Sequence, residues 1–92
     1  MTRSRSKRLL RTTDLVLATY LHLNGNEYEL VEEDGQVRAG HPQGAWEFAE
    51  TEHVTELVST FNANRATVEP VQFHNATKRL RRDMFKFLGI GT

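Results

Sequence analysis

Three stretches of the chain place apolar residues at the spacing of an α-helix. Residues 15–23 are apolar around most of their circumference, which predicts a helix that is buried on more than one side. We expect it to begin near Asp14, after a capping threonine, because an acid in the first turn complements the positive end of the helix dipole. Asn24-Gly25 is expected to end it, since glycine accepts the left-handed conformation common at helix C-termini.

Two further helices are predicted in the second half of the chain. Thr51 can cap a helix with an i, i+3, i+4, i+7 apolar stripe, formed by Val54, Leu57, Val58 and Phe61. Pro70 fits the first turn of a closing helix, where its missing N–H is not needed, and Gly89 follows as a stop signal. The predicted core face of this helix lies within about 40° of Leu80 on a helical wheel. It comprises Phe73, Ala76, Leu80, Met84 and Phe87.

Alternating apolar and polar residues predict strands. Tyr28 and Leu30 alternate with glutamates, and Trp46 and Phe48 alternate with small or acidic residues, as in strands with one polar face. Asp34-Gly35 is a two-residue turn signal that predicts a hairpin, and the segment 67–69 could add an edge strand. We therefore expect an α+β fold, with a small antiparallel sheet of two to three strands packed against three helices, in the order α-β-β-α-(β)-α.

The length and composition fit one small domain. The 92 residues include 38% apolar residues and no cysteine, which excludes disulfides and thiolate metal sites. No apolar run approaches the ~20 residues that a membrane span needs, and no signal-peptide apolar region is present, so we expect a soluble, cytoplasmic protein. We assign residues 1–11 to a flexible basic arm and residues 12–90 to one compact domain. Its small core and exposed strand edge leave a homodimer open.

Charge is balanced in total but segregated along the chain. Twelve Lys and Arg residues balance twelve Asp and Glu residues. Residues 1–11 hold five bases and no acid, residues 27–56 hold nine acids and one base, and residues 78–86 hold five bases and one acid. Two interpretations follow: the basic ends compensate the acidic centre within the fold, or two opposed faces exist and at least one meets a charged partner.

The basic ends suggest DNA or RNA binding through non-specific phosphate contacts. On the closing helix, cations lie opposite the predicted core face together with an aromatic ring on which a base could stack. The candidate residues are Arg3, Arg5, Lys7, Arg8 and Arg11 on the arm, and His74, Lys78, Arg81, Arg82, Phe85 and Lys86 on the helix. The competing interpretation is a solvated basic helix face, with Phe85 packed on Ile90 around the Gly89 cap.

A second functional hypothesis is a protein-interaction module, such as a phage-borne inhibitor or an assembly subunit with a larger protein partner. The acidic hairpin would carry it, with glutamates at positions 27, 29, 32 and 33 and Asp34, or the aromatic residues Trp46 and Phe48 would anchor it. Enzyme activity is the least supported class, because no catalytic or phosphate-binding motif occurs. The four histidines lack metal-ligand spacing, so we expect no metal and no cofactor.

The chain also resembles an uncharacterised family of small proteins carried by bacteria, phages and other mobile elements. The resemblance rests on Thr12-Thr13-Asp14-Leu15 opening a helix that ends at Asn24-Gly25, on Trp46-Glu47-Phe48-Ala49-Glu50, and on the closing-helix pattern Phe73-x-x-Ala76-x-x-x-Leu80-Arg81. It covers residues 12–88, and the stretch 37–44 is longer than the tight hairpin of the family. The resemblance implies a fold pattern and a mobile-element setting, with no activity attached.

Overall fold

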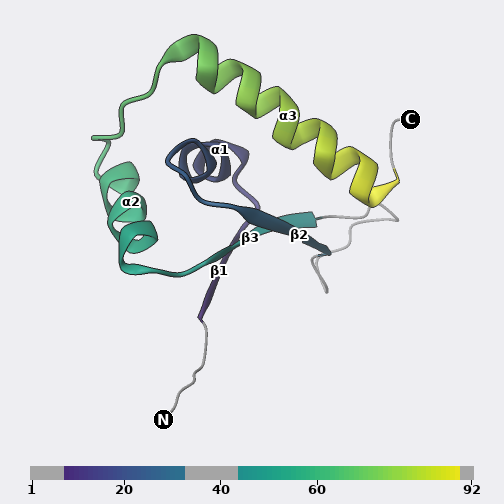
Figure 1. Ribbon diagram of the computed structural model, residues 1–92, viewed down its shortest axis with the longest axis horizontal. Helices are drawn as coiled ribbons and strands as arrows, with labels where there is room; N and C mark the ends of the chain where they lie inside the picture. Colours follow the sequence, from purple (N-terminus) through teal and green to yellow (C-terminus); the bar gives the residue numbers. More distant parts are fainter. Residues whose placement is uncertain (1–7, 33–43, 90–92) are drawn as a thin grey trace.

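The computed structural model describes residues 8–32 and 44–89 of the chain. Within these residues, the elements in chain order are β1 (Leu9–Thr12), α1 (Leu15–Leu23), β2 (Tyr28–Glu32), β3 (Gly44–Ala49), α2 (Glu52–Asn62) and α3 (Pro70–Leu88). The strands form one antiparallel sheet in the order β1-β3-β2. Helix α1 is central and contacts both other helices, while α3 lies at the outer edge of the molecule (Figure 1). The predicted α+β class is confirmed.

The third strand of the sheet is not where the sequence predicted it. The segment 67–69 forms no strand, and the edge strand is instead β1, in which Leu10 lies opposite Phe48 of β3. The prediction of a flexible arm through Arg11 is therefore wrong for residues 9–11, while residues 1–7 lie outside the described residues. Four residues are too few to show a clear period-two pattern, and β1 gains its backbone partners only from the distant strand β3.

The predicted antiparallel pairing of the strand at Tyr28–Glu32 with the strand at Gly44–Ala49 is confirmed. Tyr28 lies opposite Phe48, and Leu30 lies opposite Trp46. Both aromatic residues of β3 are buried, as expected for the inward side of a strand with one polar face. The Asp34-Gly35 turn lies outside the described residues.

The helices begin and end largely where the sequence predicted. Asp14 itself caps α1, because its Oδ1 accepts hydrogen bonds from the backbone N–H groups of Val16 (2.9 Å) and Leu17 (3.3 Å). Thr51 caps α2 through Val54 N–H (3.1 Å). Pro70 opens α3, and Gly89 ends it with a left-handed φ of 74°.

One core joins the three helices to the inner face of the sheet. Its buried members are Ala18, Leu21, Trp46, Phe48, Val54, Leu80 and Met84. Gly44 brings β3 close to α3, since a Cβ at this position would collide with Sδ of Met84. The predicted core face of α3 is confirmed at Ala76, Leu80 and Met84, but Phe87 is 45% exposed. In the last turn of α3, Leu88 packs against the core instead. Phe87 therefore lies beside the contact between α3 and the core.

The role of β1 can be tested within the strand itself. Leu10 packs against the core, whereas Leu9 is 56% exposed. We expect Leu10→Ala to lower the free energy of unfolding by about 1–2 kcal/mol, because it removes a partly buried side chain, and Leu9→Ala to lower it by less than about 0.5 kcal/mol. Chemical denaturation followed by the fluorescence of Trp46, the only tryptophan of the chain, measures both. Equal effects would contradict the docking of β1.

Candidate nucleic-acid interface

The surface of α3 that faces away from the core carries the candidate interface. The helix has 19 residues and is therefore about 28 Å long. Ala76, Leu80 and Met84 are buried on its inner side, where α3 contacts α1 and β2. No other described helix or strand lies over the opposite side of the helix (Figure 1).

Five cationic side chains of this helix are exposed: Lys78, Arg79, Arg81, Arg82 and Lys86. Within residues 8–32 and 44–89, none of them forms an ion pair with an acidic side chain. Lys78, Arg82 and Lys86 form one row along the helix, because residues four positions apart are neighbours on its surface. Arg79 and Arg81 lie on opposite flanks of that row, about 160° apart. In the part of the chain that the structure describes, this positive charge is therefore not neutralised by ion pairing.

Asp83 is the one acidic residue within α3, and the fold turns it away from the basic face. Its Oδ2 accepts a hydrogen bond of 2.7 Å from the hydroxyl group of Tyr28 on β2. Burial raises the pKa of Tyr28 to about 12, and the hydrogen bond and the charge of Asp83 add to this rise, while Arg79 opposes it. The tyrosine thus stays protonated and holds the carboxylate at the β2–α3 contact.

The two remaining candidates on α3 are also accessible. His74 is exposed one turn before Lys78, and Phe85 is 44% exposed. The ring of Phe85 has no ring contact with another described aromatic residue. Its predicted contact with Ile90 lies outside the described residues. The structure therefore brings all six predicted helix residues onto one open surface.

The predicted arm residues are not gathered with this surface. Arg3, Arg5 and Lys7 lie outside the described residues, and Arg8 is exposed directly before β1. Arg11 belongs to β1, where its Nη2 lies 2.9 Å from Oε2 of Glu47. This pair stands on the outer face of the sheet, on the side opposite Phe48 and the helices, so Arg11 is separated from the basic face of α3.

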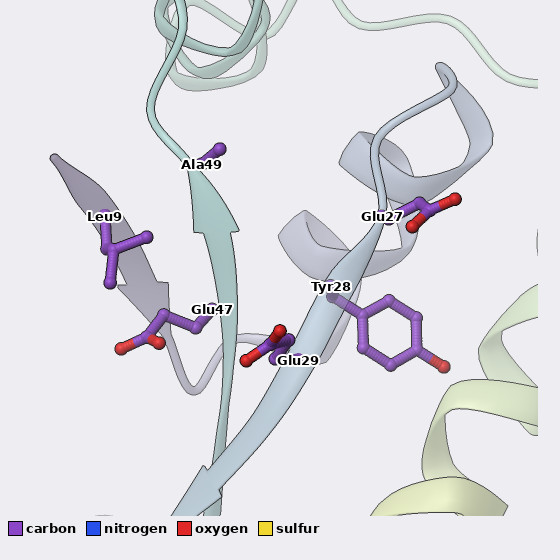
Figure 2. Close-up of a pocket in the computed structure, with 6 residues that line it drawn as sticks. All are labelled: Leu9, Glu27, Tyr28, Glu29, Glu47 and Ala49. Carbon is purple, nitrogen blue, oxygen red and sulfur yellow. The ribbon is translucent and has the colours of Figure 1, made fainter. Parts of the chain in front are cut away.

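The outer face of the sheet is acidic. Glu29 of β2 lies directly opposite Glu47 of β3. Figure 2 shows the Glu47 side chain between Leu9 and Glu29, while the ring of Tyr28 points toward α3. With Glu27 and Ala49, these residues line a shallow hollow of about 260 Å³. The predicted patch is present at Glu27 and Glu29. Glu32 is exposed at the end of β2, but strand alternation places it on the side of Tyr28 and Leu30, and Glu33 and Asp34 lie outside the described residues. Glu47 was not predicted as a member, because only the strand register brings it there.

A metal centre and a membrane-spanning helix each require features that can be sought in residues 8–32 and 44–89. No group of three or more His, Asp or Glu side chains in these ranges is arranged to hold a metal ion. No described helix combines the length and the apolar character needed to cross a bilayer.

Comparison with known proteins identifies a family but not an activity. No curated protein and no solved structure matches the chain. A family model matches residues 7–86, and this match begins before β1, further upstream than the resemblance seen in the sequence. As expected from that resemblance, the chain belongs to an uncharacterised family, the domain of unknown function DUF5659.

Proposed function

We propose that this protein is a small, non-enzymatic nucleic-acid-binding accessory protein of phage or mobile-element origin. The observation that carries the proposal is the exposed surface of α3, with Lys78, Arg81, Arg82 and Lys86 on its outward face and Arg79 at its flank. None of these five cations has an acidic partner among the described residues. Lysine and arginine side chains bind phosphate groups by charge, and arginine adds bidentate hydrogen bonds. A nucleic-acid backbone is the partner that supplies anionic groups in a regular row.

The position of the cations suits phosphate contacts without base recognition. Lys78 and Lys86 lie eight residues apart, or about 12 Å along the helix axis, and the three arginines fall between them. Such a face neutralises a few neighbouring phosphates and carries no pattern of groups that distinguishes one base from another. In sequence, Arg3, Arg5, Lys7 and Arg8 add four positive charges before β1, and we include them in the proposed binding surface.

The dependence of affinity on salt tests the proposal. Binding of the full chain to a labelled oligonucleotide is measured by fluorescence anisotropy across a salt series. We expect a linear fall of log K with log [salt], with a slope between about −4 and −8, because each phosphate contact contributes about −0.9 on a duplex and about −0.7 on a single strand. The shallower slope, about −4, corresponds to phosphate contacts by the five cations of α3 alone. A protein that binds no oligonucleotide even at low salt would overturn the proposal.

The acidic outer face of the sheet favours a second candidate function, binding of a basic protein partner. Its hollow combines the carboxylates of Glu27, Glu29 and Glu47 with the apolar side chains of Leu9 and Ala49, a surface that suits a basic, partly apolar peptide. Glu29→Lys would abolish binding of such a partner. The same substitution should leave oligonucleotide binding through α3 intact, so the two functions can be separated.

A further inference from the structure

One aromatic side chain stands within the basic face of α3. Phe85 is 44% exposed, and its neighbours one turn toward the N-terminus are Arg81 and Arg82, while Lys86 follows it. Long side chains on a helix lean toward its N-terminus, so the ring extends over the turn that carries the two arginines. A ring and several cations thus occupy one continuous, open surface.

Phe87 provides an internal comparison for Phe85. It is 45% exposed on the same helix, so both rings present a similar fraction of their surface to solvent. Two residues span 200° of helix rotation, which places the two side chains about 160° apart. Phe87 therefore points toward the core side of α3, at the flank of the contact made by Leu88. Only Phe85 lies among the cations.

The ring of Phe85 suits a nucleic acid whose base faces are free. In a duplex, each base is stacked on its neighbours and offers only its edges in the grooves. In a single strand, bases can swing out and stack on an aromatic side chain, while adjacent phosphates pair with nearby cations. Cations alone bind a duplex at least as well as a single strand, whereas an exposed ring between them contributes only to the single-stranded form.

We propose that the outward face of α3 binds single-stranded nucleic acid through base stacking, with Phe85 as the stacking platform for a base. This inference rests on the proposed function and deepens it, because it names the form of nucleic acid. Arg81, Arg82 and Lys86 hold the phosphates on either side of the stacked nucleotide. The binding is tolerant of sequence, since every base offers a flat face.

The test compares a single-stranded oligonucleotide with a duplex of the same sequence, using the full chain at one low salt concentration. For Phe85→Ala we expect an affinity for the single strand about tenfold weaker, the low end of the effect of losing one base–aromatic stack, and an unchanged affinity for the duplex. Phe85→Leu should lose as much, because it keeps an apolar side chain without a ring. Phe87→Ala is the matched control and should bind both forms as the unmodified protein does.

A strand with abasic sites provides the complementary measurement. The unmodified protein should bind it about tenfold more weakly than the normal strand, and Phe85→Ala should bind the two strands alike. If Phe85→Ala weakens single strand and duplex equally, or neither, the inference is wrong while the proposed function stands. If the unmodified protein binds neither the single strand nor the duplex, the inference and the proposed function are both wrong.

Discussion

Replacing Arg81 and Arg82 together by glutamate is expected to weaken nucleic-acid binding by about a hundredfold or more at low salt. Each phosphate contact contributes roughly tenfold to affinity at about 50 mM salt, as follows from a slope of about −0.9 per contact. Two contacts are lost, and the new carboxylates repel the phosphates that the arginines held. The slope of log K against log [salt] should also become shallower by about two.

The control for this double variant must change charge without touching the basic face. Arg65 is exposed in the segment between α2 and α3, so Arg65→Glu changes one charge as the single variant Arg82→Glu does. We expect Arg65→Glu to bind nearly normally and Arg82→Glu to lose about tenfold or more. Acids near a helix C-terminus oppose the helix dipole at about 0.3–1 kcal/mol each, so Trp46 fluorescence should verify folding of both. Equal losses would show that net charge, not the α3 face, governs binding.

The basic face could be predicted because the arrangement of side chains around a helix depends only on the sequence of that helix. Once residues 70–88 are assigned to one helix, the period of 3.6 residues separates Lys78 and Arg82 from Leu80 without knowledge of any other element. The exposure of these cations in the structure confirms that step. The same reasoning failed at Phe87, because its exposure depends on how the last turn of α3 packs against the core.

Features that depend on pairing between distant segments could not be predicted in the same way. Strand β1 is four residues long, and its place in the sheet is decided by β3, which lies more than 30 residues further along the chain. The Tyr28–Asp83 hydrogen bond and the Glu29–Glu47 pairing likewise join segments whose relative position only the fold determines. Sequence patterns therefore located the candidate interface on α3 and the Glu27 and Glu29 part of the acidic face, but not the place of Glu47 in that face.

Among the residues of α3, Leu80 is the one whose truncation should most weaken the packing of the helix against the core. Its side chain is fully buried where α3 meets the core, and it lies between Ala76 and Met84 on the buried side of the helix. We expect Leu80→Ala to lower the free energy of unfolding by about 2–5 kcal/mol, through lost burial and the cavity left behind. Phe87→Ala, on the same helix but 45% exposed, should cost less than about 1 kcal/mol, and chemical denaturation followed by Trp46 measures both.

The effect of Leu80→Ala on binding follows from its effect on folding. A domain of this size has about 5–15 kcal/mol of stability, so the variant remains largely folded at low temperature, keeps all five cations of α3 and should bind oligonucleotide normally. Because a ligand that prefers the folded state stabilises it, saturating oligonucleotide should raise the denaturation midpoint of Leu80→Ala but not that of the Arg81→Glu, Arg82→Glu double variant. If oligonucleotide left the midpoint of Leu80→Ala unchanged although it bound, the folded helix would not be what the nucleic acid recognises.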